Sequence, residues 1–319
     1  MKTMKSKFYS LALAAGMLTL TACSDDNTND SNNDKGNGIE NGSTLKGTIT
    51  EDVTLKAGNT YKLSGEYIVE AGATLNIEEG VKIISVYDNI VDYILVKQGA
   101  KINAVGTPDK PIVMTSEKEE PGAWGGIHIC GKAHTNAEGG KGSSEIGGAV
   151  YGGNDDADNS GTLQYIRLEY TGFAFDEEHE ANGISFYGVG SGTIVDHCEA
   201  YKGSDDGFEF FGGSVNVSNM VVVSCSDDSF DWTEGWNGKG TDLVAYQEAK
   251  ATLGYDCDCL IEADNNENDN AATPVSHPVL KNLILAGNGE SKQGIRLRRG
   301  TQADIDNAKV CGKGQPLVV

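Results

Sequence analysis

Residues 205–213 read Asp-Asp-Gly-Phe-Glu-Phe-Phe-Gly-Gly, and residues 227–232 repeat the start of this segment as Asp-Asp-Ser-Phe-Asp-Trp. The two segments begin 22 residues apart, and Gly183-Ile184-Ser185-Phe186 stands 24 residues before Gly207-Phe208-Glu209-Phe210. Each segment alternates apolar and other side chains, which is the period of a β-strand. Self-similarity at this spacing without a helical period predicts a solenoid of short strands stacked coil upon coil.

The first half of the chain has the same organisation. Residues 72–77 (Gly-Ala-Thr-Leu-Asn-Ile) recur 27 residues later as residues 99–104 (Gly-Ala-Lys-Ile-Asn-Ala). A leucine-rich repeat would need a fixed leucine and asparagine frame, and a sandwich would show hairpin turns every 8–12 residues. We therefore predict an all-β fold, a right-handed parallel β-helix over residues 44–319. Two insertions, roughly 134–160 and 264–278, interrupt its register.

The N-terminus has the pattern of an export signal. Three lysines at positions 2, 5 and 7 precede an apolar stretch that ends in Leu20-Thr21-Ala22-Cys23. This pattern resembles a bacterial lipoprotein cleavage box and predicts removal of residues 1–22 and lipidation of Cys23. The alternative is an ordinary secretory signal in which Cys23 is incidental. Residues 23–43 are rich in Asn, Asp, Gly and Ser, so we expect a flexible tether.

The charge of the chain excludes some classes of partner. The sequence has 47 acidic and 25 basic residues, a formal net charge of −22. A nucleic-acid partner is not expected, because contacts to phosphates need clustered Lys and Arg. The same charge repels anionic lipids and uronic-acid polymers unless a cation lies between them.

Several segments resemble a family of secreted or lipid-anchored bacterial β-helix proteins that is common in Bacteroidota and has no well-established activity. The matching segments are residues 124–127, 151–155, 161–163, 205–213 and 261–265. The resemblance implies the fold but hardly any reaction. Ser24-Asp25-Asp26 also resembles the surface-export signal of Bacteroidota lipoproteins. It implies an outer-membrane protein that is lipid-anchored and faces the cell exterior. In that location we expect an extracellular glycan or a surface protein as its partner.

Aligning the repeats predicts which side chains stack on one another. One set of positions points into the coil: Ile127, Ile184, Phe208, Phe230, Ile261 and Ile295. The residues that follow them point outward in one row, which we call the outer row: His128, Ser185, Glu209, Asp231, Glu262 and Arg296. Three of these are acids on successive coils, about 5 Å apart.

Carboxylates this close raise one another's pKa or need a cation between them. We therefore predict a calcium site, since calcium takes several carboxylate and carbonyl oxygens. Its candidate ligands are Asp205, Asp206, Glu209, Asp227, Asp228, Asp231, Glu262 and Asp264. The alternative is a solvated acidic face in which the Asp pairs form turns before the strands.

A second, weaker metal loop is predicted at residues 156–161. Asp156, Asp158 and Ser160 occupy the first, third and fifth positions, with Gly161 sixth, as at the start of a calcium loop. The twelfth position is Arg167, where a bidentate glutamate is needed, so this is not an EF-hand. The alternative is a turn rich in Asx residues.

Two classes of function follow from these residues. The leading hypothesis is a rigid surface protein that binds a glycan or a cell-surface ligand, with calcium as its candidate cofactor. The alternative is a polysaccharide lyase or glycoside hydrolase. The catalytic candidates are then Asp205, Asp206, Asp227, Asp228 and Arg296. The Gly-His-Gly element of β-helix polygalacturonases is missing after the aspartate pair, and Arg296 has a simpler role in balancing the acids.

Aromatic and cysteine residues add two further expectations. Phe211 and Trp236 lie near predicted turns, so we expect them to be exposed and to stack on sugar rings. The alternative is that the aromatic residues fill the core. Six cysteines follow Cys23: Cys130, Cys198, Cys225, Cys257, Cys259 and Cys311. We expect buried free thiols, with room for one disulfide.

Overall fold

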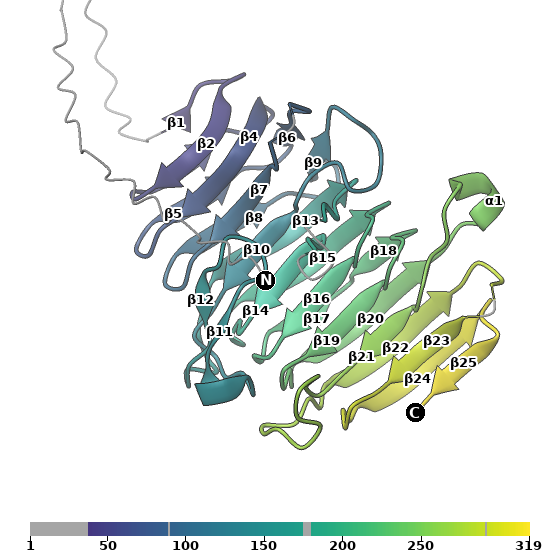
Figure 1. The fold of residues 1–319 in the computed structure, drawn as a ribbon. Coiled ribbons are helices and arrows are strands. Elements are labelled where there is room, and N and C mark those ends of the chain that lie inside the picture. The colour runs from purple at the N-terminus through teal and green to yellow at the C-terminus, as the bar shows by residue number, and fades with distance from the viewer. Residues whose placement is uncertain (1–37, 89, 175–179, 291) are drawn as a thin grey trace, which may run out of the picture. The chain divides into compact units, whose positions relative to one another are not determined.

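A computed structural model describes residues 38–88, 90–174, 180–290 and 292–319 of the chain. The prediction of an all-β solenoid is confirmed, because a 23-stranded sheet whose strand pairs are all parallel runs through these residues (Figure 1). The predicted signal 1–22, the candidate lipidation site Cys23 and most of the tether lie outside the described residues. The first strand begins at Gly38, before the expected start at Thr44. Among the described residues, no helix is long and apolar enough to cross a membrane.

Strands of successive coils pair in three ladders. The first ladder, which we call the site ladder, contains β2 (Thr44–Ile49), β4 (Thr60–Val69), β7 (Tyr93–Val96), β10 (Ile127–Cys130), β14 (Ile184–Tyr187), β16 (Phe208–Phe211), β19 (Phe230–Thr233), β21 (Ile261–Ala263), β23 (Gln293–Leu297) and β25 (Gln315–Val318).

The second ladder contains β1 (Gly38–Ile39), β3 (Val53–Leu55), β5 (Thr74–Ile77), β8 (Lys101–Val105), β13 (Gly161–Glu169), β15 (Ile194–Tyr201), β17 (Asn216–Ser218), β20 (Lys239–Tyr246), β22 (Val279–Ala286) and β24 (Asp304–Cys311). The third ladder joins β6 (Lys82–Ser85), β9 (Ile112–Ser116) and β18 (Val221–Val223) to the first segment of β4 and to the second segments of the long strands β13, β15, β20, β22 and β24.

A column of left-handed residues turns the chain from the second ladder to the third. Six consecutive coils place a non-glycine residue there with φ between 52° and 59°: Tyr165, His197, Asn219, Asp242, Asn282 and Asn307. Asn and Asp tolerate this conformation better than most residues. The side-chain amide of Asn307 donates to Asn282 Oδ1 at 2.8 Å, and Asn282 in turn donates to Asp242 Oδ1 at 2.9 Å. The corner is therefore held by a stack of polar side chains.

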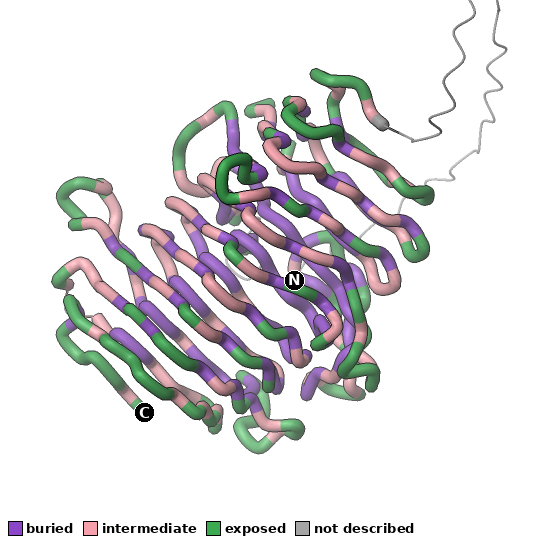
Figure 2. The backbone as a smooth tube through the Cα atoms, turned by 180° about the vertical axis from the view of Figure 1, so that it is seen from behind, coloured by how far each residue is buried: buried purple, intermediate pink, exposed green. Residues whose placement is uncertain are grey.

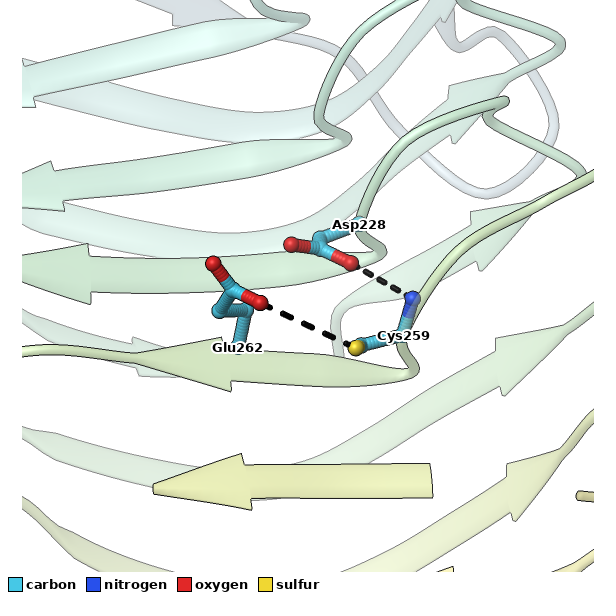
Figure 3. A group of neighbouring side chains, drawn as sticks. All are labelled: Asp228, Cys259 and Glu262. Atoms are coloured by element: carbon cyan, nitrogen blue, oxygen red, sulfur yellow. Dashed lines mark hydrogen bonds between the residues drawn. The ribbon is translucent and has the colours of Figure 1, made fainter. Parts of the chain in front are cut away.

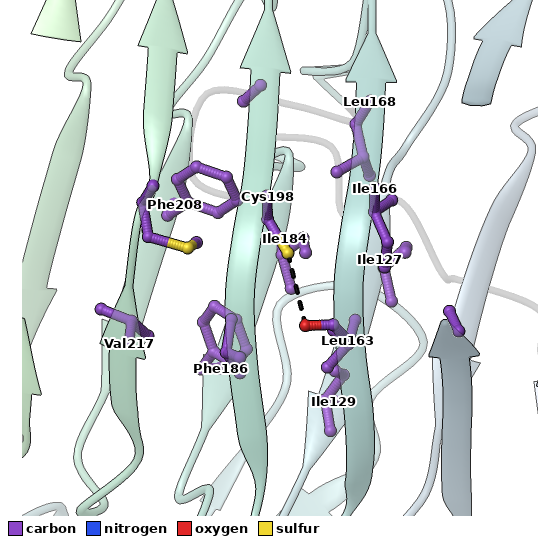
Figure 4. Close-up of a cluster of buried hydrophobic side chains, with 14 of the residues drawn as sticks. Ile127, Ile129, Leu163, Ile166, Leu168, Ile184, Phe186, Cys198, Phe208 and Val217 are labelled. Atoms are coloured by element: carbon purple, nitrogen blue, oxygen red, sulfur yellow. Dashed lines mark hydrogen bonds between the residues drawn. The ribbon is translucent and has the colours of Figure 1, made fainter. Parts of the chain in front are cut away.

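The core lies inside the coil, where the inward positions stack. The structure confirms the predicted register, with Ile127, Ile184, Phe208, Phe230, Ile261 and Ile295 in successive partner positions and all buried. Figure 4 shows the first three of them. Phe210 lies between two other rings, 5.0 Å from Phe186 and 4.2 Å from Trp236 by ring centroids. Trp236 is 1% exposed, so its predicted exposure is wrong: its turn directs the ring into the coil.

Three excursions leave the coil. The first insertion contains a short 3-10 helix (Glu138–Gly140) and the antiparallel strands β11 (Gly142–Ser143) and β12 (Val150–Tyr151). It covers part of the outer face of the site ladder, where it forms a second buried cluster: Tyr93, Leu95, Cys130, Ile146, Ala149, Tyr151, Ala181, Tyr187 and Phe211. The loop after β21 is the second. The third, with α1 (Lys250–Leu253), has no counterpart in the sequence prediction. Figure 2 shows exposed residues gathered in loops, with buried residues along the strands.

Candidate functional site

The outer row has the predicted register. His128, Ser185 and Glu209 are successive partners, and Asp231, Glu262 and Arg296 continue the row on β19, β21 and β23. The first insertion covers the start of the row, so His128 is fully buried and burial lowers its pKa to about 4. Glu209 is the first residue of the outer row beyond the part that this insertion covers.

A cavity of about 710 Å³ opens where the cover ends. Its walls come from the site ladder, both insertions and the turn after β23. The lining residues are Ser143, Glu145, Tyr151, Tyr187, Glu209, Phe211, Asp231, Thr233, Glu234, Asp264, Asn266, Glu267, Asn268, Arg298 and Arg299. Phe211 stacks on Tyr187 with ring centroids 4.4 Å apart, and the two rings form one wall. The cavity is therefore acidic on most sides and aromatic on one.

Two acids of the outer row, Glu209 and Asp231, line this cavity. Carboxylate oxygens of Asp206, Glu209 and Asp231 lie within 4.8 Å of one another. Burial, reinforced by neighbouring carboxylates, raises the pKa of Glu209 and of Asp231 well above the usual range. The side chain of Asn182 donates to Glu209 Oε2 at 2.6 Å. Asp231 Oδ1 is buried and has no hydrogen-bond partner among the described residues.

Arginines neutralise the far end of the acidic row. Arg298 donates from Nε and Nη2 to the two oxygens of Asp264, each at 2.9 Å, and also pairs with Glu262. Arg299 donates to Asp264 at 2.7 Å. The predicted catalytic residue Arg296 donates to Glu262 at 2.8 Å. No contact between Arg296 and the predicted catalytic aspartates is found in the described part of the chain.

The aspartates before β16 and β19 connect one coil to the next. Asp206 Oδ1 accepts the backbone N–H of Asp228 at 2.9 Å, and Asp228 Oδ1 accepts that of Cys259 at 2.6 Å (Figure 3). Asn182 occupies the same place one coil earlier, where its Oδ1 accepts the N–H of Asp206 at 3.2 Å. Burial and the adjacent aspartates raise the pKa of both Asp206 and Asp228 well above the usual range. These two side chains are structural links between coils.

Other groups of candidate ligands lie beside this chain of hydrogen bonds. Oxygens of Glu180, Asp205 and Asp227 come within 4.8 Å of one another, and so do ligand atoms of Asp228, Cys259 and Glu262. In the second group, the Cys259 thiol lies 3.9 Å from Glu262 Oε1 (Figure 3). Glu262 is already paired with two arginines, which disfavours a cation there. The first group is the better candidate for calcium.

The residues of the second predicted metal loop bind protein groups. Asp156 Oδ1 accepts from Nδ1 of His134 at 2.7 Å and from its backbone N–H at 3.1 Å. Asp158 Oδ2 accepts the N–H of Lys132 at 3.2 Å and the Ser160 hydroxyl at 3.3 Å. These contacts fasten the first insertion, and in the same loop Asn159 Oδ1 accepts the N–H of Gly161 at 2.8 Å, as in an Asx turn.

The two predicted sugar-stacking residues have different positions. Phe211 is 7% exposed, so its predicted exposure is also wrong, but it lines the cavity beside Tyr187. Trp236 packs in the core against Phe210 and cannot meet a ligand. Three acids of the cavity, Glu145, Glu234 and Glu267, were missed because each lies in a turn or insertion outside the repeats. Tyr187 could have been found, since it is the partner of Phe211 in the register.

Cysteines of the β-helix are free thiols. Cys130, Cys198, Cys225, Cys257 and Cys259 are buried and Cys311 is exposed, with no disulfide among the described residues. Burial raises the pKa of Cys198 and Cys225 to about 12.

Comparison with known proteins is informative at the level of the family. Residues 47–319 match a family model described as a pectate-lyase like beta helix domain. No curated protein sequence matches the chain.

Proposed function

Because the chain belongs to the family of pectate-lyase-like β-helix domains, we propose that it binds an extracellular carbohydrate in the acidic cavity beside β16 and β19. The observation that carries the proposal is the cavity itself. Its volume of about 710 Å³ is typical of ligand sites, and it combines the ring of Phe211 with the carboxylates of Glu209 and Asp231. Carboxylates accept hydrogen bonds from sugar hydroxyls, and an aromatic ring packs against the apolar side of a sugar ring.

Binding without catalysis is favoured by the roles of the predicted catalytic residues. Asp206 and Asp228 each accept a backbone N–H from the next coil, and Arg296 is paired with Glu262. These contacts occupy Asp206, Asp228 and Arg296, which makes these three residues poor candidates for catalysis.

The test is a titration of the purified chain with a panel of neutral, amino and acidic oligosaccharides, followed by calorimetry. We expect one class to bind, and the double variant Glu209→Gln/Asp231→Asn to bind it at least about tenfold more weakly. The matched control is Asp109→Asn/Glu117→Gln, which removes the same charge from exposed positions. Failure of every class to bind would refute the proposal.

The second candidate function is cleavage of a glycosidic bond in the same cavity. Glu209 and Asp231 lie close together, and the raised pKa of each suits a general acid. New reducing ends, or absorbance from an unsaturated product, would establish turnover on the panel. Turnover that survives Glu209→Gln would exclude Glu209 as its acid.

Calcium binding stays a prediction, and Glu180, Asp205 and Asp227 are its best candidate ligands. Thermal unfolding in EDTA and then in millimolar calcium tests it, because a ligand of the native state raises the melting temperature by mass action. Asp205→Asn/Asp227→Asn should remove that rise. An equal rise of the melting temperature in the variant would show that calcium binds elsewhere.

Surface anchoring through Cys23 is likewise proposed from the sequence. We expect the wild-type chain in the outer-membrane fraction, accessible to protease on intact cells, and the Cys23→Ala variant in the soluble fraction. Equal membrane association of the two would contradict the anchor.

A further inference from the structure

The charges on the cavity wall are unequal. Its acidic residues are Glu145, Glu209, Asp231, Glu234, Asp264 and Glu267, whereas its basic residues are Arg298 and Arg299. A wall of this composition attracts a positive group and repels a carboxylate.

The two arginines are already neutralised by protein carboxylates. Arg298 pairs with Glu262 and with both oxygens of Asp264. Arg299 pairs with Asp264 at 2.7 Å and with Glu267 at 3.6 Å. Arg298 also attracts Asp231, but burial still raises the pKa of that carboxyl well above the usual range, so the guanidinium groups offset the acids on the opposite side of the cavity only in part.

Three of those acids have neutral donors or an unsatisfied oxygen. Glu209 accepts from the Asn182 amide at 2.6 Å. Glu234 Oε2 accepts the hydroxyls of Thr135 and Tyr151, each at 2.7 Å. Asp231 Oδ1 is buried without a hydrogen-bond partner among the described residues. That oxygen has no accessible surface, so a ligand in the cavity would meet the other atoms of Asp231 and the carboxylates of Glu209 and Glu234, whose donors named above are neutral.

The missing partner is therefore a positively charged donor. Building on the proposed carbohydrate function, we propose that the cavity selects a saccharide carrying protonated amino groups. An ammonium donates up to three hydrogen bonds and neutralises neighbouring carboxylates. A bare cation would fill little of a cavity of about 710 Å³, and the side chain of Phe211 offers it no ligand atom. A uronic-acid polymer would bring like charge to Glu209, Asp231 and Glu234.

The pKa shifts of two cavity acids agree with this assignment. Burial, together with the like charge of Glu145 and then Asp231, raises the pKa of Glu209. Burial, together with Glu262 and Asp264, raises the pKa of Asp231. A cation between these carboxyls would favour their ionised forms, so binding should release protons to the buffer.

The test is calorimetric titration of the full chain with glucosamine oligomers and with N-acetylglucosamine oligomers of equal length. Buffer, salt and a pH at which the amines are protonated are held constant. We expect the amino oligomer to bind about tenfold or more tightly, because charge-assisted hydrogen bonds are roughly twice as strong as neutral ones. This advantage should shrink as salt is raised. It should also disappear in Glu209→Gln/Asp231→Asn but persist in Asp109→Asn/Glu117→Gln.

Each of the other outcomes overturns a different part of the proposal. Equal affinity for the two oligomers, or tighter binding of oligogalacturonate, would overturn the selection of amines while leaving carbohydrate binding intact. Absence of binding by every saccharide would remove the proposed function and this inference together. Equal binding of the amino oligomer by the cavity variant and the surface control would show that the oligomer binds outside the cavity. If the double variant does not fold, Glu234→Gln serves in its place.

Discussion

Asp206 Oδ1 accepts the backbone N–H of Asp228 at 2.9 Å, so a side chain of one coil completes the backbone hydrogen bonding of the next. This contact predicts different effects for two substitutions. Asp206→Ala leaves a buried N–H without an acceptor and should cost about 1 to 3 kcal/mol of stability. Asp206→Asn keeps an acceptor oxygen and removes a charge that burial and its neighbours disfavour, so it should be neutral or stabilising. Thermal unfolding of the two variants beside the wild type checks this. An equal loss of stability in both would mean that the carboxylate charge itself is needed.

The buried acids predict a stability that falls as the pH rises. The pKa values of Asp206, Glu209, Asp228 and Asp231 are all raised in the folded chain, so the native state binds more protons than the unfolded chain above about pH 4. Their contribution to stability is therefore fully present below that pH and is lost as the pH rises through the folded pKa values.

Melting temperatures measured in EDTA from pH 4 to pH 8 test this sign. The difference between wild type and Asp231→Asn isolates one of the four groups, and it should favour the variant increasingly with pH. A difference that is constant over the range would show that Asp231 has the same pKa in both states.

The outer row could be predicted from the sequence, but the cavity could not. Parallel stacking carries one register from coil to coil, so the repeats at Phe208 and Phe230 predict that Glu209 and Asp231 are partners. Glu145 and Glu234 lie outside the repeats and line the cavity from loops. The path of such a loop cannot be predicted from the period of the sequence.

Turn positions set a second limit on prediction. Trp236 lies in a turn, and nothing in its spacing indicates that the ring enters the coil to stack on Phe210. Asp206 and Asp228 recur at equivalent positions, but spacing does not distinguish a catalytic pair from acceptors for the backbone of the next coil.

Arg298 should be far more important for stability than Arg296. The Glu262 and Asp264 side chains that Arg298 binds are 13% and 7% exposed. Removing Arg298 leaves Glu262 with Arg296 alone and Asp264 with Arg299 alone, and we expect the loss of its hydrogen bonds in Arg298→Ala to cost about 2 to 3 kcal/mol. Arg296 is 37% exposed and holds one of these acids, so Arg296→Ala should cost about 1 kcal/mol or less. Denaturant unfolding compares the two, and equal losses would contradict the assignment of Arg298 as the main counter-ion.

The free thiols predict a sharp contrast in reactivity. Cys311 is exposed, whereas burial raises the pKa of Cys198 and Cys225 to about 12, so about one of these thiols in ten thousand is ionised at pH 8. Iodoacetamide should therefore alkylate Cys311 in the native chain and reach the buried cysteines after unfolding in denaturant. Peptide mass spectrometry measures both states, and alkylation of native Cys198 at the rate of Cys311 would show that the coils open readily. The same spectra test the anchor, because a lipidated Cys23 stays unalkylated even in denaturant.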